Sequence, residues 1–426
     1  MRPPNAAQPT PPPDRRVVVT GMGAVSCIGN TLDDILAALR QQRSGLRHVA
    51  EYAELGLRSQ VAGVPDLSAE APVPRKLARY MGDPALYAYH AMRKALDDAR
   101  LPEAALHHPR TGLVAGSGVG SAFNHLSGIQ TLRERGADKI PPYLVPRAMG
   151  STVSANLATI FGIQGVSFSI TSACATSAHC IGQAAQLIQA GKQDVVFAGG
   201  AEEVCWTSTA LFDAMGALST GFNATPEQAS RPYAIDRDGF VIAGGGGMLV
   251  LESLAHARAR QAQIYGELIG FGATSDGRDM VNPDPDGAAR AMRLALAEAG
   301  IGIGIGIGIG IDYVNTHATS TVNGDLSELK ALAAVFGDAL PRYGSTKGLT
   351  GHPIGAAGVH EAIYCLLMLE HQFIAGSPAC APLDPQLITF APPLTGALDH
   401  PLTTAMSNSF GFGGTNASLI FRHPPD

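Results

Sequence analysis

The chain has 426 residues, 46% of them hydrophobic and only 15% charged, so a large share of the sequence must lie inside a core. The formal net charge of -6 gives no indication of a nucleic-acid partner. Six cysteines without a CxxC pair are too sparse for a secreted disulfide scaffold and favour a reducing compartment.

The proline-rich residues 1–15 lack the apolar core of a signal peptide, so we expect a disordered lead-in there. No run of about 18 apolar residues occurs in the sequence, which predicts that there is no transmembrane helix. We therefore expect a soluble cytoplasmic protein without membrane contact.

Short apolar runs bounded by glycine alternate along the chain with helical patterns. Buried strands are predicted at residues 17–23, 111–118, 195–202, 246–252, 311–317 and 416–421. Helices are predicted at residues 83–99, 180–191, 288–300 and 360–371. This alternation predicts an α/β protein in which helices cover buried sheets.

A weak internal repeat relates the two halves of the chain. Each half has a glycine-flanked strand followed by a small-residue turn and a helix, in SITSACATSAHCIGQAAQ and in STKGLTGHPIGAAGVHEAIYC. The two strings suggest a duplicated topology with a seam near residues 252–262. The segment IGIGIGIGIG at 301–310 is interpreted as a loop extension, with an edge strand as the alternative, because alternate glycines make a strand entropically costly.

Cys174 is the first candidate for a reactive group. It stands in SITSACATSAHC, where a strand-like run ends and a helix begins. The positive end of a helix dipole favours the thiolate, and the small neighbours leave room for a substrate. Cys180, six residues further on, is expected to pack in the core, and His179 is expected to be a surface or packing histidine.

Two distant histidines strengthen this hypothesis. His317 follows a predicted strand in IDYVNTHATST, and His352 lies in the glycine-rich loop STKGLTGHPIGAAG. One thiol and two imidazoles suit covalent acyl transfer, in which the thiolate takes the acyl group and the imidazoles donate to developing oxygen charge. A metal site is the alternative, although no carboxylate or second thiol shares these motifs. No glycine-rich string gives a complete GxGxxG or P-loop, so a nucleotide cofactor is not expected.

Five strings carry a specific family resemblance: TSACATSAHCIGQA, GFVIAGGGGM, VNTHATSTVNGD, KGLTGHPIGAAGVHEA and MSNSFGFGGTNA. They resemble the beta-ketoacyl-acyl-carrier-protein synthases, the elongating condensing enzymes of the thiolase superfamily. The resemblance runs in order from about Arg16 to Phe421. The first string and VVFAGGAEEVCW look most like synthase I of bacterial type II fatty acid synthesis.

The resemblance implies a five-layered αβαβα thiolase fold of two duplicated halves. The N-terminal half, residues 16–262, would carry the nucleophile, and the C-terminal half, residues 263–424, the two histidines. It also implies a homodimer and decarboxylative condensation of acyl and malonyl groups carried by acyl carrier protein. No resident cofactor is implied, because the carrier brings the phosphopantetheine. A synthase II or a type II polyketide or polyene ketosynthase is the alternative, while a non-catalytic chain-length factor is disfavoured because Cys174 is retained.

The resemblance assigns the central chemistry to four residues. Cys174 would be the nucleophile, and its amide with that of Phe412 would form the oxyanion hole. His317 and His352 would stabilise the enolate during decarboxylation. Phe412 would also gate the acyl pocket.

Further roles follow from the resemblance alone. Lys347 and Glu361 would pair as an ordering network, and Asp325 and Glu328 would support the catalytic groups. Substrate would be bound by Thr319, Thr321, Gly118, Phe212, Phe410 and the partner subunit's Met149. Carrier protein would dock on Arg75, Lys76, Arg79, Arg133, Arg135 and Lys139. A structural monovalent cation would lie near Asn315, Glu361, Ser407 and Asn408.

Three features depart from the family pattern. Ala318 stands where glycine is common, and Ala234 stands where an acid is expected. The repeat at 301–310 is longer than the usual connection. None of these departures touches the nucleophile or the two histidines.

Overall fold

A computed structural model describes residues 15–302, 310–387 and 390–424. The predicted lead-in, except for Arg15, lies outside the described residues. Residues 303–309, the middle of the isoleucine–glycine repeat, also lie outside them.

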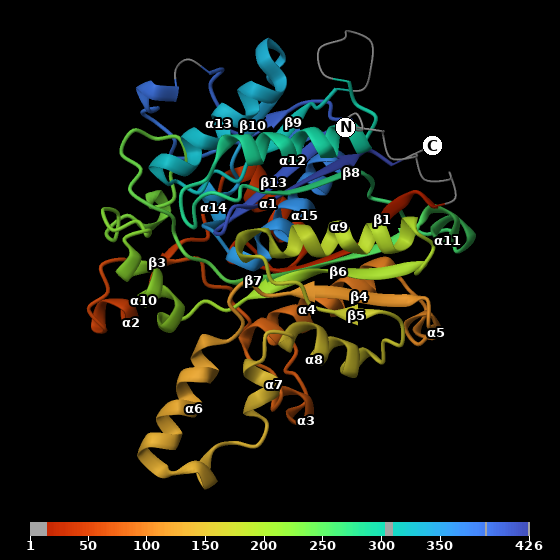
Figure 1. The fold of residues 1–426 in the computed structure, drawn as a ribbon, viewed down its shortest axis with the longest axis vertical. Helices are drawn as coiled ribbons and strands as arrows, with labels where there is room; N and C mark the ends of the chain where they lie inside the picture. Colours follow the sequence, from red (N-terminus) through yellow and green to blue (C-terminus); the bar gives the residue numbers. More distant parts are fainter. Residues whose placement is uncertain (1–14, 303–309, 388–389, 425–426) are drawn as a thin grey trace.

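A ten-stranded sheet repeats one strand order in the two halves of the chain (Figure 1). The first half contributes β1 (Val17–Val25), β4 (Thr111–Gly116), β5 (Ser167–Phe168), β6 (Val195–Glu202) and β7 (Gly245–Ser253). The second half contributes β8 (Gly266–Ser275), β9 (Tyr313–Asn315), β10 (Arg342–Gly344), β13 (Thr404–Gly411) and β14 (Thr415–Arg422).

The five strands of each half can be numbered from first to fifth by their order in the chain. Across the sheet, both halves then have the order third, second, fourth, fifth, first, namely β5-β4-β6-β7-β1 and β10-β9-β13-β14-β8. In each set the third, second and fourth strands are parallel, and the fifth is antiparallel to both of its neighbours. The first strands of the two sets, β1 and β8, pair with each other. The predicted duplicated topology is therefore confirmed.

Helices form three layers around the two strand sets (Figure 1). The middle layer holds α9 (Thr176–Gln189) and α15 (Ala357–His371), and the outer layers hold α4 (Asp83–Ala99) with α8 (Thr152–Phe161) and α12 (Pro285–Glu298) with α13 (Val322–Phe336). Every residue of α15 from Ala357 to Leu369 is buried, as expected for a helix that is apolar on all sides. The five-layered αβαβα fold is thus confirmed.

Shorter elements decorate this framework. The remaining helices are α1 (Leu32–Gln41), α2 (Ala50–Glu54), α3 (Arg75–Ala78), α5 (Glu103–Leu106), α6 (Ala122–Arg135), α7 (Leu144–Ala148), α10 (Trp206–Met215), α11 (Leu254–Ala259) and α14 (Lys347–Thr350). The short strands are β2 (Arg47–His48), β3 (Val61–Ala62), β11 (Phe373–Ile374) and β12 (Leu398–Asp399). The 3-10 turns are η2 (Ala137–Lys139), η3 (Ala173–Ala175), η4 (Pro226–Gln228), η5 (Gly337–Ala339), η6 (Ile354–Ala356) and η7 (Pro385–Leu387). Among the described helices, none combines the length and apolarity needed to cross a bilayer.

The six predicted strands and four predicted helices are all present, with ends shifted by a few residues. The predicted seam near residues 252–262 covers the end of β7 and α11, directly before β8. The middle-layer helices approach each other closely, because a Cβ on Gly358 of α15 would lie 2.6 Å from the Ala178 nitrogen of α9. This contact brings together the turns that precede α9 and α15, and these turns carry the candidate site.

Candidate active site

Cys174 lies in η3, directly before the first turn of α9. The residue before it, Ala173, has a φ of 48°, in the left-handed region that non-glycine residues rarely adopt. The end of β13 packs against this turn, since a Cβ on Gly411 would lie 3.1 Å from the Cys174 nitrogen. The backbone N–H of Phe412, the next residue, interacts with the Cys174 thiol and lowers its pKa.

Glu328 fixes the backbone around His317. Its two carboxylate oxygens accept the N–H groups of His317 and Ala318, at 3.0 and 2.8 Å. The side-chain amide of Asn408 donates to the same carboxylate at 3.0 Å. Burial raises the pKa of Glu328 to about 7, and these three donors oppose the rise.

His352 is held by the segment that precedes the glycine run GGGG. Its N–H donates to the Val241 carbonyl at 2.8 Å, and its own carbonyl accepts the N–H of Ala243 at 3.1 Å. His352 is only 3% exposed. A strand-like bridge to Ile242 thus fixes the backbone at His352.

Cys174, His317 and His352 converge, as the sequence predicts. The sulfur and one ring nitrogen of each histidine all lie within 4.8 Å of one another. Among the described residues, Nδ1 of His317 and both ring nitrogens of His352 have no hydrogen-bond partner. Burial, followed by the charge of Lys347, holds the pKa of both histidines well below 6.5. Both rings are therefore neutral at physiological pH, and each has one N–H that can donate.

The cluster of Cys174, His317 and His352 can also be compared with a metal site, the alternative that the sequence left open. Three ligand atoms lie close enough to share an ion. A closed structural zinc site needs four ligands. Glu328 lines the same cavity, but its oxygens already accept three hydrogen bonds. The described residues thus supply three of the four ligands that a closed structural site needs.

The prediction that the helix end lowers the pKa of Cys174 is wrong in direction. Burial around the sulfur raises its pKa to about 12, and the charge of Lys347 and the N–H of Phe412 only partly oppose this rise. The desolvation cost of a thiolate outweighs the nearby dipole and charge. In the resting protein the group is a thiol, so its proton must leave during the reaction.

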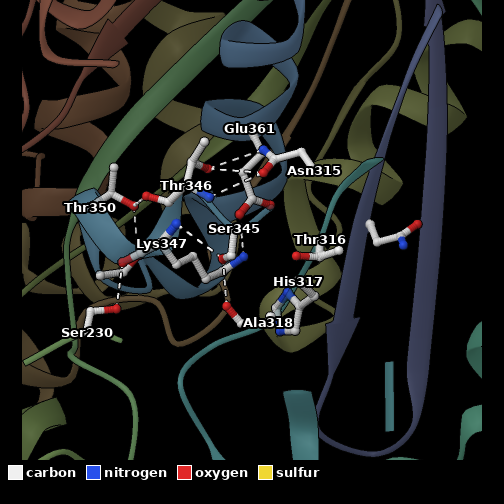
Figure 2. A network of polar contacts seen from close by, with 12 residues as sticks. Ser230, Asn315, Thr316, His317, Ala318, Ser345, Thr346, Lys347, Thr350 and Glu361 are labelled. Atoms are coloured by element: carbon white, nitrogen blue, oxygen red, sulfur yellow. Dashed lines mark hydrogen bonds and ion pairs between the residues drawn. The ribbon is translucent and has the colours of Figure 1, made fainter. Parts of the chain in front are cut away.

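Lys347 and Glu361 form the predicted buried ion pair (Figure 2). Lys347 is 1% exposed and begins α14, and Glu361 lies in the first turns of α15. Burial raises the pKa of Glu361 to about 7, against the effect of the lysine charge. Figure 2 also shows Thr346 beside Asn315, whose Oδ1 accepts the Thr346 N–H and Oγ1 at 3.4 and 3.3 Å.

The residues expected around a structural cation fit such an ion only in part. Asn315 and Ser407 are direct partners in the neighbouring strands β9 and β13. Within the described chain, Glu361 Oε2 and Ser407 Oγ are buried oxygens without partners. Asn408 Oδ1, in contrast, accepts Ser418 Oγ at 2.8 Å. Among the side chains of these four residues, two buried oxygens are thus free to contact an ion.

A cavity of about 380 Å³ opens above the three reactive groups. Of the predicted site residues, it is lined by Cys174, His317, His352, Glu328, Thr319, Thr321, Phe212, Phe410 and Phe412. The hydroxyls of Thr319 and Thr321 are 3.1 Å apart, and the Phe212 and Phe412 rings are 6.4 Å apart. Gly118 and Met149 do not line this cavity.

Asp325 supports the site from the rear. It is fully buried, accepts the N–H groups of Tyr233 and Ser320 at 2.9 and 3.1 Å, and lies 3.4 Å from the Arg237 guanidinium. Burial raises the pKa of Asp325 to about 6. This network holds the loop that contains Thr319.

The six basic residues of the expected docking patch are all exposed. They form two groups, Arg75, Lys76 and Arg79 in and just after α3, and Arg133, Arg135 and Lys139 at the end of α6 and in η2. Figure 1 shows α7 between α3 and α6. Arg147 of α7 donates to the Arg79 carbonyl at 2.8 Å, which ties this helix to the first group.

Comparison with known proteins gives the family. The family model for the beta-ketoacyl synthase N-terminal domain matches residues 14–257, and the model for the C-terminal domain matches residues 265–380. The chain belongs to the beta-ketoacyl synthase family. It is 53% identical to 3-oxoacyl-[acyl-carrier-protein] synthase 1 of Escherichia coli K12, over 97% of this chain and 100% of that protein. It is 52% identical to the Haemophilus influenzae protein of the same name, over 96% and 99%. A crystal structure of a beta-ketoacyl synthase from Burkholderia phymatum matches with a TM-score of 0.89 and 36% identity, over 96% of this chain and 100% of that chain.

Two residues of this beta-ketoacyl synthase, Ser172 and Glu202, were not identified as site residues from the sequence. Ser172, two residues before the nucleophile, lies 2.8 Å from Nδ1 of His179, whose ring also packs edge to face on Phe271. His179 is therefore the predicted packing histidine, and Cys180 is fully buried in the core as predicted. The second group is Glu202, a fully buried carboxylate that ends β6. A glutamate at the end of a buried strand beside two glycines is the only sequence signal for it.

Proposed function

We propose that the chain condenses an acyl group with malonyl-acyl carrier protein, releasing CO2 and forming 3-oxoacyl-acyl carrier protein. The observation that carries this proposal is the convergence of one thiol and two neutral imidazoles at the base of a lined cavity. The names of the relatives that are 52–53% identical over nearly the whole chain support the same reaction.

The first step transfers the acyl chain to Cys174. Sulfur attacks the thioester carbonyl, and the thiol proton moves to a neutral imidazole beside it. The N–H groups of Cys174 and Phe412 donate to the carbonyl oxygen as its charge grows. The C–S bond to the carrier then breaks, and the departing pantetheine thiolate takes the proton back from that imidazole, which becomes neutral again.

The second step decarboxylates the malonyl group. When the C–C bond to the carboxylate breaks, its electron pair moves onto the thioester oxygen as an enolate. N–H groups of His317 and His352 donate to that oxygen. Because burial and Lys347 keep both rings neutral, each ring has one N–H that can donate to the enolate oxygen.

The third step joins the two carbon chains. The enolate carbon attacks the acyl carbonyl, whose oxygen returns to the amides of Cys174 and Phe412. The bond between carbon and Cys174 sulfur then breaks, and the sulfur regains a proton. Thr319 and Thr321, whose hydroxyls line the cavity, hold the pantetheine arm through both half-reactions.

The acyl chain lies against the apolar cluster behind Cys174. That cluster includes Phe240, Ile242 and Ile354, with Phe212 packed at its edge. Gly118 borders it, because a Cβ there would lie 3.0 Å from Ile354 Cγ2. The reaction needs no cofactor resident in the protein, because the carrier supplies the reactive thioester.

Acyl carrier protein is the partner that this function requires, and the names of the relatives include it. The chain has a net negative charge, but six exposed residues supply positive charge at its surface: Arg75, Lys76, Arg79, Arg133, Arg135 and Lys139. A local basic patch attracts an acidic carrier and orients its pantetheine arm.

We infer a homodimer as the working state. β5 lies at the end of the sheet, where its edge is free in the described chain. Phe168 on that strand and Phe123, Ile129 and Leu132 on α6 are exposed apolar residues. An unpaired edge strand with an exposed aromatic residue favours pairing with a second copy, and exposed apolar residues on α6 are a further candidate contact. Sedimentation equilibrium should give twice the chain mass, and a monomer at micromolar concentration would contradict this inference.

Synthase I activity is the subtype that the names of the relatives favour, with synthase II or polyketide ketosynthase activity as the alternative. The test is incubation of the purified protein with acyl carrier proteins of graded chain length and with malonyl carrier protein. Formation of 3-oxoacyl carrier protein supports the proposal, and its chain-length profile separates the subtypes. Absence of product with every chain length would contradict the proposed reaction and would indicate a non-catalytic subunit instead.

A further inference from the structure

Glu202 is a buried carboxylate that the proposed reaction does not use. Its Oε1 accepts Ser117 Oγ at 2.6 Å and the N–H of Val119 at 3.2 Å. Its Oε2 accepts the N–H groups of Gly118 at 2.7 Å and Gly355 at 2.9 Å. Three of these donors belong to the loop after β4 in the first half, and the fourth belongs to η6 in the second half. One side chain therefore ties the two halves together.

The duplication explains why Gly355 offers its N–H there. Gly355 lies in η6 two residues before α15, and Cys174 lies in η3 two residues before α9, so they hold the same place in the two halves. The residue before each has a similar left-handed backbone, with φ of 48° at Ala173 and 41° at Ile354.

The strand that faces each turn is also equivalent. β13 and β6 are the fourth strands of their sets, and each ends at the turn of the opposite half. Gly411, the last residue of β13, packs on the Cys174 nitrogen, and Glu202, the last residue of β6, accepts from the Gly355 nitrogen. The fold thus builds two amide clusters, one beside the nucleophile and one that a carboxylate fills.

The filled cluster includes the turn that follows His352. Gly355 follows His352 by three residues, and Ile354 between them lines the cavity beside the imidazole. A Cβ on Gly355 would lie 2.4 Å from the Gly118 nitrogen and 2.7 Å from Glu202 Oε2, so the turn is pressed against the loop and the carboxylate. Any rotation of this turn would move His352 relative to Cys174.

We propose that Glu202 is a positioning residue for His352, because its carboxylate fills the second amide cluster and locks the turn from His352 to Gly355. The inference rests on the proposed function. It predicts that decarboxylation, which needs both imidazoles, depends on Glu202 far more than acyl transfer does.

The negative charge of Glu202 is a further reason to expect different effects on acyl transfer and on decarboxylation. Burial raises the pKa of Glu202 to about 7, and its four hydrogen bonds oppose this rise. The charge of Glu202 in turn raises the pKa of the Cys174 thiol. Removing that charge should therefore leave acyl transfer undiminished. A glutamine keeps only one acceptor oxygen, so two of the four donors lose their acceptor and the turn is held less firmly.

The test compares Glu202→Gln with Glu203→Gln. Glu203 is the adjacent buried carboxylate, and it accepts Ser121 Oγ at 2.8 Å and the Phe123 N–H at 3.1 Å, away from the His352 turn. Acyl transfer is followed by the mass of the acyl-enzyme formed from acyl carrier protein. Decarboxylation is followed by CO2 release from malonyl carrier protein added to pre-acylated enzyme.

We expect Glu202→Gln to slow CO2 release by roughly tenfold or more, with acyl transfer unchanged within about threefold. Glu203→Gln should leave both rates within about threefold of the wild type. An equal fall of both rates in Glu202→Gln, no fall in either, or the same fall in Glu203→Gln would overturn the positioning role. Failure of the wild-type protein in either half-reaction would instead contradict the proposed function.

A milder variant covers the case in which Glu202→Gln does not fold. Ser117→Ala removes one of the four donors and keeps the carboxylate. It should slow CO2 release by a few-fold with acyl transfer unchanged. Equal effects on the two steps, or no effect on CO2 release, would contradict the inference.

Discussion

His317 and His352 face each other edge to face, with ring centroids 5.1 Å apart and planes at 87°. Phe410 and Phe240 pack on their far sides, with ring centroids at 6.0 and 5.5 Å. The two imidazoles therefore have little freedom to turn, although three of their four nitrogens are buried without a hydrogen-bond partner among the described residues. Ring nitrogens without a protein partner are free to donate to a substrate or accept a proton from it.

The two cysteines of TSACATSAHC should differ in effect. Cys174→Ala should abolish formation of the acyl-enzyme, because the nucleophile is lost. Cys180→Ala should keep acyl-enzyme formation and lower the free energy of unfolding by about 1–2 kcal/mol, since its side chain is fully buried in α9. Mass spectrometry and denaturant melts check these outcomes. Equal loss of acylation in both variants would contradict the assignment.

Alkylation of Cys174 should report its raised pKa. With a thiol pKa near 12, the rate with iodoacetamide should rise about tenfold per pH unit from pH 7 to 9, because the thiolate fraction does so. The Cys174→Ala variant gives the background rate from the other five cysteines. A rate that levels off near neutral pH would show that the thiol pKa lies below 8.

Removing Lys347 should raise the pKa of both histidines, because its positive charge lowers them. Titration of the imidazole resonances by NMR in Lys347→Met measures the direction. The pKa of each ring should rise and still lie below 6.5, because burial is the larger cause. A further fall would contradict the electrostatic account.

Lys347 should also stabilise the folded protein through its ion pair with Glu361. Lys347→Met or Glu361→Gln leaves one buried charge unpaired and should lower the free energy of unfolding by about 3–5 kcal/mol. The double variant removes both charges, so its loss should be smaller than the sum of the single losses. Additive losses in denaturant titrations would show that the two side chains do not interact.

Reversing Arg75, Lys76 and Arg79 to Glu should raise KM for carrier-linked substrates roughly tenfold or more, with little change for free pantetheine thioesters. Reversal of the exposed Arg100, Lys192 and Lys330 is the matched control for net charge. Equal changes in KM for both kinds of substrate would remove the docking role from α3.

Sequence patterns predicted the duplicated topology because the buried strands and middle-layer helices are locally consistent, as α4 at residues 83–99 illustrates. β8 and β13 were missed, since GELIGFGATS is rich in glycine and TAMSNSFG is rich in polar residues. Their burial comes from neighbouring strands and helices, not from a local apolar run.

The candidate site, like the fold, could be predicted from the sequence only in part. Cys174, His317 and His352 stand in small-residue turns that local sequence can reveal. The sign of the Cys174 pKa shift was not predictable, because desolvation depends on elements far away in the chain. Glu202 escaped notice for a related reason, since three of its four partners become visible only when β4 and β6 lie side by side.

The central claim is that Cys174 carries the acyl chain between the two carrier proteins. The most direct measurement is the intact mass of the protein after acyl carrier protein alone, and again after malonyl carrier protein is added. The mass should first rise by one acyl group on Cys174, then return to its starting value as 3-oxoacyl carrier protein and CO2 appear in equal amounts. Product formation without an acylated Cys174, or an acyl group that malonyl carrier protein cannot discharge, would contradict the account.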